Sequence, residues 1–386
     1  MKEIIIIGFY QPNANLNKLI SNEQKQHSIP IRYLQEFASL GTGGGLYQFR
    51  DQIMIGSPDH IFVMNSDVCG DIPFEEMLEF SNNKTGDCFL ILGTEATNEQ
   101  SKQFGCIVEN PDTHEVLHYV EKPSTFVSRI INCGIYLFTP GIFKFLRVAF
   151  LSGQESSEND VHYIKESINL EKEVFQPMAG SKTLFVLKTS RFWSQIKNTS
   201  SVIYANRHYL SLYKEKCPER LAEIHYNSLI ELNKAEDYLI GSAKGPIIVG
   251  HVFIHPNTLI DKTAVIGPNV SIAENVKIGL GVRLRDCIVL QDAQIGSHAC
   301  CINAVIGWNA KVGEWSRIEG TPNDPNPNMP FKMVEILPIF NENGQLNPSI
   351  TVIGSDVIVP PEVFIYNSIV LPNKELDSSC KSQIIL

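Results

Sequence analysis

The last third of the chain repeats an aliphatic residue at every sixth position. A helix with one buried face repeats about every 3.6 residues, and an isolated strand alternates every two. A period of six is typical of a parallel β-helix, in which each hexad forms one side of a coil and its aliphatic residue points inward. We therefore expect a solenoid of hexapeptide repeats over residues 246–386, with a set of unrelated short strands as the alternative. The repeated residues are Ile254, Ile260, Ile266, Ile272, Ile278, Leu284 and Leu290.

The six-residue phase is interrupted twice. It slips between Leu290 and Cys300, and it breaks again over residues 319–352. The second break contains three prolines and three asparagines between Thr321 and Asn328, which favour neither strand nor helix. We expect an insertion loop there, either a binding loop on one face of the solenoid or a plain excursion into solvent. Between and after the breaks the phase is carried by Ile306, Val312, Ile318, Ile353, Val359, Ile365 and Leu371.

The first half of the chain has α/β character, because short apolar runs alternate with segments of helical spacing. We expect a domain over residues 1–200 with a mostly parallel sheet covered on both faces, and a helical linker over residues 201–245. The expected helices are Leu46 to Ile55, Phe74 to Ser81 and Val202 to Leu221. The expected strands are Ile4 to Ile7, Ile31 to Leu34, Ile61 to Met64, Cys88 to Leu92 and Leu184 to Leu187.

Charge and composition exclude several partners. The net charge of −10 argues against a nucleic-acid or anionic-membrane surface, since both need basic patches. No apolar run approaches the roughly 20 residues that a membrane span needs. The nine cysteines lack the paired spacing of a zinc site, which favours reduced thiols. We expect a cytoplasmic protein without a nucleic-acid or membrane partner.

Four short motifs in the first half contain residues suited to phosphates and sugars. Gly41 to Gly45, expected in a turn before a helix, would let a nucleotide approach the backbone, although such a run is often only a turn. Asp67 after an apolar run could ligate Mg²⁺, or it could cap a turn. Lys122 could hold a sugar phosphate, and Asn132 with Gly134 could meet sugar hydroxyls; a surface turn and a strand start are the alternatives.

Taken together and in this order, ahead of a hexapeptide solenoid, these motifs resemble the mannose-1-phosphate guanylyltransferases, most closely their alpha, or regulatory, subunits. The resemblance covers nearly the whole chain. It rests on the following segments: Ile6-Ile7-Gly8-Phe9-Tyr10-Gln11-Pro12, Arg32-Tyr33-Leu34-Gln35-Glu36-Phe37, His118 to Phe126, Glu319-Gly320-Thr321-Pro322 and Gln383-Ile384-Ile385-Leu386.

The resemblance implies a Rossmann-like nucleotidyltransferase domain followed by a left-handed parallel β-helix. It also implies a nucleotide site, a vestigial Mg²⁺ ligand at Asp67, and sugar or phosphate contacts. The nucleotide site would comprise Gly41, Thr42, Gly43, Gly44 and Gly45. The sugar and phosphate contacts would be Lys122, Asn132, Gly134 and Glu171.

Two departures from the active family members suggest lost catalysis. The chain begins about where their second strand would, without the glycine-rich loop that wraps the triphosphate, so we expect an N-terminally truncated domain. Gln195 stands where they carry a second metal-ligand aspartate, and Lys197 replaces a glycine. An amide is a poor Mg²⁺ ligand, so no catalytic residue is expected.

The leading hypothesis is therefore a regulatory subunit that binds GDP-mannose and assembles, as a homo- and hetero-oligomer, with a catalytic beta-type guanylyltransferase. The first alternative is an active guanylyltransferase that makes GDP-mannose from GTP and mannose 1-phosphate. A second is a hexapeptide acyltransferase with His255 or His298 as catalytic histidine, although both are expected as solenoid-surface residues. A third is a truncated form that folds poorly because its sheet has an unpaired edge.

Overall fold

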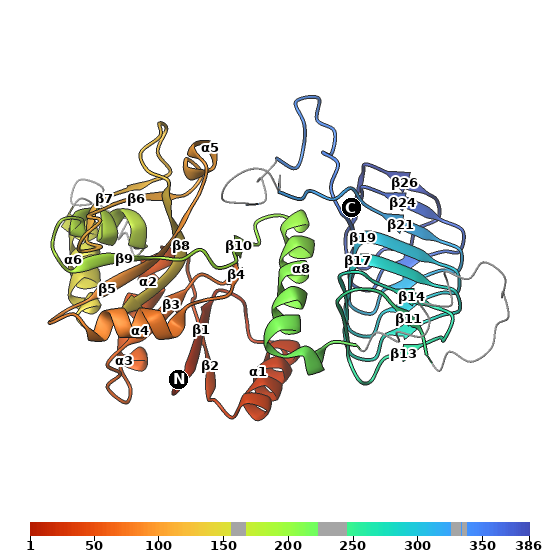
Figure 1. The fold of residues 1–386 in the computed structure, drawn as a ribbon, viewed down its shortest axis with the longest axis horizontal. Helices are drawn as coiled ribbons and strands as arrows, with labels where there is room; N and C mark the ends of the chain where they lie inside the picture. The colour runs from red at the N-terminus through yellow and green to blue at the C-terminus, as the bar shows by residue number, and fades with distance from the viewer. Residues whose placement is uncertain (156–166, 223–244, 326–332, 334–337) are drawn as a thin grey trace. The chain divides into compact units, whose positions relative to one another are not determined.

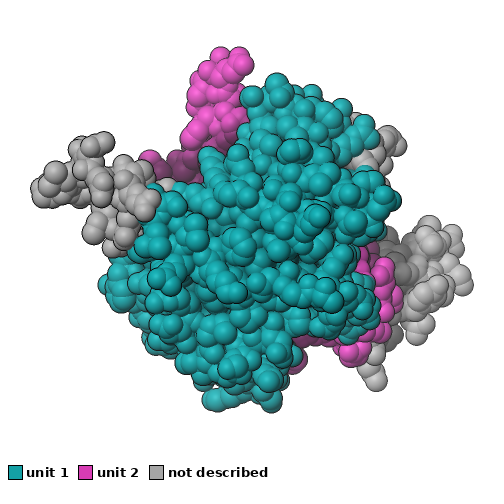
Figure 2. Space-filling model, turned by 90° about the vertical axis from the view of Figure 1, so that its left-hand side faces the viewer, with its two compact units in different colours: residues 1–68, 72–190 teal, residues 69–71, 191–386 magenta. Residues whose placement is uncertain are grey.

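The computed structural model describes residues 1–155, 167–222, 245–325, 333 and 338–386. These residues form two compact units (Figure 2). Unit 1 comprises Met1–Val68 and Ile72–Ser190, and unit 2 comprises Cys69–Asp71 and Arg191–Leu386. The contacts thus divide the chain at residue 190, and the long helix that the sequence placed in a linker belongs to unit 2. Within the described ranges, none of the helices is long and apolar enough to cross a membrane.

Unit 1 contains a six-stranded sheet in the order β7-β6-β8-β5-β9, with β3 also pairing with β8 (Figure 1). A separate parallel pair, β1 and β2, aligns Ile4 with Ile31. The strands are β1 (Ile4–Gly8), β2 (Ile31–Gln35), β3 (Ile61–Met64), β5 (Phe89–Glu95), β6 (Gly105–Glu109), β7 (Val116–Glu121), β8 (Ile130–Phe138) and β9 (Leu184–Lys188). All five strands expected from the sequence are present.

The expectation of a mostly parallel sheet is wrong. In the six-stranded sheet only β5 and β9 pair in parallel, whereas β8 runs antiparallel to β3, β5 and β6. The reason lies in β8, in which every residue from Ile131 to Phe138 is buried. A strand buried on both faces shows no alternation of apolar and polar residues. A continuous apolar run therefore does not indicate whether the strand pairs in parallel or antiparallel.

The helices of unit 1 include two long ones that the sequence reading missed, α1 and α6. They are α1 (Ala14–His27), α2 (Gly41–Gln48), α3 (Arg50–Ile53), α4 (Phe74–Asn82), α5 (Asn98–Ser101), α6 (Ile142–Glu155), a π-helical turn (Leu170–Phe175) and α7 (Gln176–Met178). The core joins the π-helical turn to the sheet, because Phe175 packs edge-on against both Tyr119 and Tyr136. This packing places the π-helical turn against the middle of the sheet, where the polar residues described below gather.

Unit 2 begins with a short strand pair and the helix α8 (Thr199–Lys216), confirming the expected helix with an earlier start. Asn198 caps α8, because its side-chain oxygen accepts the Ser201 amide at 2.9 Å. The strand pair joins β4 (Val68–Gly70) to β10 (Trp193–Gln195). A 3₁₀ turn (Pro218–Arg220) follows α8, and most of the remaining linker, residues 223–244, lies outside the described residues.

The rest of unit 2 is a solenoid of parallel strands, as the six-residue period predicted (Figure 1). Ile266, Leu284, Cys301 and Ile318 follow one another across successive coils, 18, 17 and 17 residues apart. The handedness of the coils stays a prediction. The strands are β11 (Ile247–Ile248), β12 (Val252–Ile254), β13 (Leu259–Ile260), β14 (Val265–Ile266), β15 (Val270–Ile272), β16 (Lys277–Ile278), β17 (Arg283–Val289), β18 (Gln294–Ile295), β19 (Cys300–Ile306), β20 (Lys311–Val312), β21 (Arg317–Glu319), β22 (Thr351–Ile353), β23 (Ile358–Val359), β24 (Phe364–Tyr366), β25 (Ile369–Val370), β26 (Cys380–Lys381) and β27 (Ile384–Ile385).

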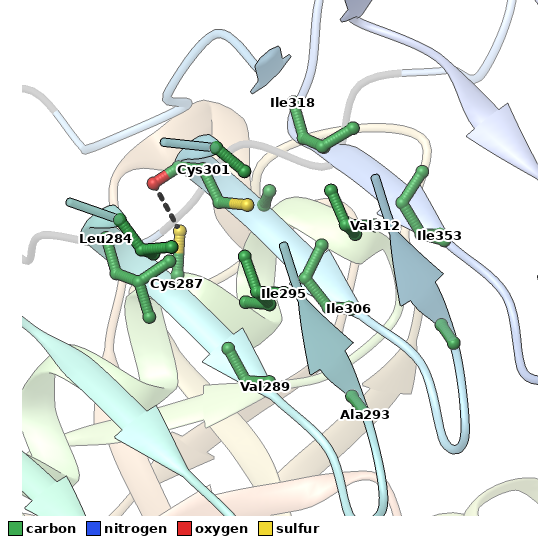
Figure 3. Close-up of a cluster of buried hydrophobic side chains, with 14 of the residues drawn as sticks. Leu284, Cys287, Val289, Ala293, Ile295, Cys301, Ile306, Val312, Ile318 and Ile353 are labelled. Carbon is green, nitrogen blue, oxygen red and sulfur yellow. Dashed lines mark hydrogen bonds between the residues drawn. The ribbon is translucent and has the colours of Figure 1, made fainter. Parts of the chain in front are cut away.

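The six-residue spacing of inward-pointing residues is broken one residue earlier than the sequence suggested. Val289 is fully buried in the core, whereas Leu290 is only half-buried (Figure 3). Likewise Val370 points inward, and Leu371 is exposed. One side of these coils is five residues long because a tight corner shortens it. The corner residues Asp286, Asn303 and Asn367 adopt left-handed conformations with φ of 47° to 48°.

The described parts of the insertion are tied back to the solenoid. The amide of Thr321 donates to the carbonyl of Ser349 at 2.9 Å, so the two ends of the insertion lie side by side. From α8, Arg207 reaches Asp324 at 2.9 Å and Asp286 of the solenoid at 3.0 Å. Residues 326–332 and 334–337 lie outside the described residues. The insertion therefore leaves and re-enters the solenoid at one place.

Candidate functional site

A buried hydrogen-bond network occupies the centre of the unit 1 sheet. Asn132, only 8% exposed on β8, donates from its amide nitrogen to the hydroxyls of Tyr119 and Tyr136, each at 3.0 Å. Its amide oxygen accepts the backbone N–H of Gly134 at 2.8 Å. The side chain thus makes three hydrogen bonds inside the protein, and it fixes both tyrosine hydroxyls in place.

Two carboxylates border this network. Tyr119 donates to Glu121 at 3.1 Å, and Thr42 on α2 donates to Glu171 at 2.7 Å. Glu171 belongs to the π-helical turn and is 8% exposed. Burial, reinforced by these negative charges, raises the pKa of Tyr119 and of Tyr136 well above the usual value. Both phenols therefore stay neutral, and the site combines hydroxyls, an amide and two carboxylates.

The glycine run has a different setting from the one expected. Gly41 to Gly45 form the first turns of helix α2, so the expectation of a turn before a helix is wrong. A Cβ on Gly41 would lie 2.6 Å from the carbonyl oxygen of Ile168, and one on Gly45 would collide with Glu36. Gly41, whose φ is +71°, therefore requires glycine, whereas the end of the flexible Glu36 side chain can move away from a Cβ at position 45. Helix propensity along the sequence could not reveal either contact. Their contact with a nucleotide stays a prediction.

The structure brings two of the four motifs together. The backbone N–H of Asn65 donates to the carbonyl of Gly134 at 2.9 Å, so the Asn65-Ser66-Asp67 motif adjoins the motif that begins at Asn132. Gly134 has a φ of +71°, and a Cβ there would lie 2.7 Å from the Asn65 side-chain nitrogen. The glycine is therefore needed for this approach. Antiparallel pairing of β3 with β8 produces the contact, because Met64 lies opposite Ile135.

Asp67 and Lys122 lie on turns. Asp67 is half-buried in the turn between β3 and β4, and Lys122 is exposed directly after β7 with a φ of +45°. The amide of Lys122 is bonded to the carbonyl of Phe104 at 3.1 Å, which fixes the turn and leaves the ammonium group at the surface. Among the described residues, no three His, Cys, Asp or Glu side chains are grouped as a metal site would require. Within these residues Asp67 thus belongs to no cage of protein ligands, and its role as an Mg²⁺ ligand stays a prediction, because Mg²⁺ is usually held by one or two carboxylates together with water and substrate phosphates.

The remaining predicted residues belong to unit 2. Gln195 ends β10, and its side-chain oxygen is buried without a hydrogen-bond partner within the described part of the chain. His255 accepts the amide of Asn257 through its Nδ1 at 3.3 Å, and the ring of His298 stacks on Trp315 with centroids 4.2 Å apart. His255 directly follows β12 and His298 lies in a turn of the solenoid, and a catalytic role for either stays untested.

The sequence reading missed the part that Tyr119 and Tyr136 play. A signal was present, because Tyr136 interrupts the apolar run Ile135 to Phe138, and a buried tyrosine hydroxyl almost always needs a partner. What the sequence could not show is that the partner is Asn132, only four residues away on the same strand.

Comparison with known proteins covers both units. The nucleotidyl transferase family model matches residues 1–211, and the model of the GMPPB C-terminal domain matches residues 248–385. The chain is 51% identical over 391 residues to the mannose-1-phosphate guanylyltransferase regulatory subunit alpha-B of Danio rerio. It is 49% identical over 390 residues to the regulatory subunit alpha of Xenopus tropicalis, and 48% identical over 390 residues to that of Homo sapiens. Each match covers all of this chain and 88% of the relative.

Proposed function

This chain belongs to the family of mannose-1-phosphate guanylyltransferase regulatory subunits alpha, and from that premise we propose that it binds GDP-mannose without catalysing its synthesis. In this proposal it assembles in the cytoplasm with a catalytic beta-type guanylyltransferase, in homo- and hetero-oligomers, and tunes the rate at which that partner makes GDP-mannose. The names of the relatives support a regulatory role, since a regulatory subunit acts on a partner.

The observation that carries the proposal is the network around Asn132. The partly exposed carboxylate of Glu121 accepts strongly from hydroxyls, and the buried Tyr119 phenol, held by the Asn132 amide, fixes its position. Nucleotidyl transfer instead needs positive charge or metal ions to neutralise several phosphates. The network therefore suits recognition of the sugar end of a sugar nucleotide better than it suits catalysis.

Metal chemistry has little support in this chain. Asp67 belongs to no group of three or more His, Cys, Asp or Glu side chains within the described residues, and Gln195 contributes an uncharged amide. Any Mg²⁺ near Asp67 would arrive with the phosphates of the ligand.

Titration of GDP-mannose into the full chain is the direct test. We expect measurable binding that the Lys122→Ala variant weakens about tenfold, because an exposed ammonium on a fixed turn is lost as a phosphate contact. Isothermal titration calorimetry measures both affinities. Lys144→Ala is the matched control, since its side chain on α6 is 81% exposed. Absence of any heat with the wild-type chain, or pyrophosphate release from GTP and mannose 1-phosphate by the chain alone, would refute the proposal.

The insertion is the candidate contact through which regulation reaches the partner. Since Thr321 and Ser349 are hydrogen-bonded, replacing residues 322–348 with a short Gly-Ser linker should leave the solenoid closed. We expect this variant to keep the coil structure and to lose feedback by GDP-mannose on the catalytic partner. A coupled assay of pyrophosphate release by the reconstituted complex measures the feedback. Unchanged feedback together with unchanged complex formation would remove the insertion from the mechanism.

A further inference from the structure

One outer face of the solenoid combines arginines with aromatic side chains. It lies on the neighbouring strands β17, β19, β21, β24 and β26 (Figure 1). Inward residues such as Leu284 alternate with outward ones, so the outward residues form two columns on this face. We call these residues the arginine–aromatic face. The first column is Arg283, Cys300, Arg317 and Phe364, and the second is Arg285, Ile302, Glu319, Tyr366 and Lys381.

The charge on this face is the opposite of the charge on the whole chain. It carries three arginines and Lys381 against the single carboxylate of Glu319, in a protein with a net charge of −10. Arg283 and Arg317 lie on either side of Cys300 in the first column, and Arg285 lies two residues along β17 from Arg283. The positive charge is therefore concentrated around one residue of the first column.

Little of this charge is neutralised within the protein. Arg317 pairs with Glu319 at 2.7 Å, and its side chain remains 54% exposed. Arg285 approaches Asp286 only to 3.8 Å, and Asp286 is already bonded to Arg207. Arg283 has no carboxylate partner within the described ranges. Exposed ion pairs of this kind contribute little to stability, so they can be exchanged for contacts with a partner at little cost.

Aromatic side chains surround the arginines. Phe364 and Tyr366 lie nearly parallel, with ring centroids 6.0 Å apart, and Tyr366 is also within 3.2 Å of the Thr321 hydroxyl. The turn before β21 presents Trp315, which is 62% exposed and stacked on His298. Arginine, tryptophan, tyrosine and phenylalanine are the residue types enriched in protein–protein interfaces, whereas lysine and glutamate are depleted there.

We propose that the arginine–aromatic face is the surface on which the solenoid docks an acidic surface of the catalytic subunit. The proposal rests on the regulatory function proposed above and names the face that this function uses. Charge complementarity requires an acidic partner, and the aromatic rings supply the apolar area that gives the contact its affinity. The strands are held on both sides by parallel pairing, so the face is already ordered before binding.

The solenoid offers a matched control on another sheet. Lys277 and Lys311 are exposed and point outward from β16 and β20, with Gln294 between them. Arg283 and Arg317 have the same relation to each other, two coils apart with Cys300 between them. A double reversal of either pair to glutamate changes the net charge by the same amount, so only the location of the change differs.

The test is association of the 386-residue chain with the purified catalytic homologue, measured by surface plasmon resonance at several salt concentrations. We expect Arg283→Glu with Arg317→Glu to raise the dissociation constant about 100-fold at low salt and to flatten its salt dependence. Lys277→Glu with Lys311→Glu should change it less than about threefold. Circular dichroism verifies that both variants keep their coils.

Three outcomes distinguish a failure of the proposed function from a failure of the proposed docking face. If the wild-type chain does not bind the catalytic homologue, the proposed function fails. If the wild-type chain binds and the arginine variant binds equally well, or the lysine variant loses as much affinity, the assignment of this face is wrong while the proposed function stands. If the wild-type chain binds a duplex DNA probe and loses that binding only in the arginine variant, the face recognises nucleic acid and the proposal is overturned.

Discussion

The Asn132→Leu variant should unfold its first unit with a free energy about 4 kcal/mol lower than the wild type. Leucine has the same branched shape but is larger, and it leaves the hydroxyls of Tyr119 and Tyr136 and the backbone amide of Gly134 without their partner. Each buried polar group left unpaired costs about 1–3 kcal/mol, and added apolar contact returns only part of that. Urea unfolding followed by tyrosine fluorescence measures the loss.

Asn110→Leu is the matched control for this prediction. Asn110 accepts the amides of Asp112 and Thr113 in an exposed turn between β6 and β7, where water can replace its hydrogen bonds. The control should lose about 1 kcal/mol or less. GDP-mannose binding should vanish in the Asn132 variant and persist in the control. Equal losses in the two variants would show that the network contributes nothing beyond ordinary hydrogen bonds.

The solenoid was the part of the fold that the sequence predicted best, because each coil repeats the same inward position. The period located Ile266, Ile272, Ile278 and Leu284 correctly as core residues. It failed at Leu290, because a corner residue in a left-handed conformation removes one residue from that side of the coil. Asparagine and aspartate favour that conformation but occupy many other turns as well, so Asp286 alone gave no warning.

Unit 1 was harder to predict because its site depends on contacts between distant segments. The sequence singled out Thr42 and Glu171 separately, and only the fold shows that they share a hydrogen bond of 2.7 Å. It assigned Asn132 to sugar hydroxyls, whereas the structure shows that its polar atoms are bonded to two tyrosines and Gly134. Asn132 thus acts in the proposed site by positioning the phenols, a role that spacing along one strand cannot reveal.

Gly279, Gly296 and Gly313 follow aligned strand residues on successive coils, and Gly296 leads to the second large effect. The Gly296→Val variant should lower the unfolding free energy of unit 2 by about 3 kcal/mol or more. A Cβ at Gly296 would lie 2.7 Å from the amide nitrogen of Glu314, 2.9 Å from the carbonyl carbon of Gly313 and 3.0 Å from the carbonyl oxygen of Val312. These are backbone atoms of the next coil, which cannot rotate away as a side chain would, so the coils must separate.

Gln294→Val provides the control, because it places the same β-branched side chain two residues earlier on the same coil. Gln294 points outward and is exposed, so valine fits there and should change the stability by less than about 0.5 kcal/mol. Thermal unfolding followed by circular dichroism compares the two variants. Each coil is stabilised mainly by its neighbours, so separating two coils should also loosen β21 and its Arg317, and weaken docking of the catalytic subunit. A Gly296→Val variant as stable as the control would mean that the coils can spread without cost, and the rigid face proposed for β17 to β26 would lose its basis.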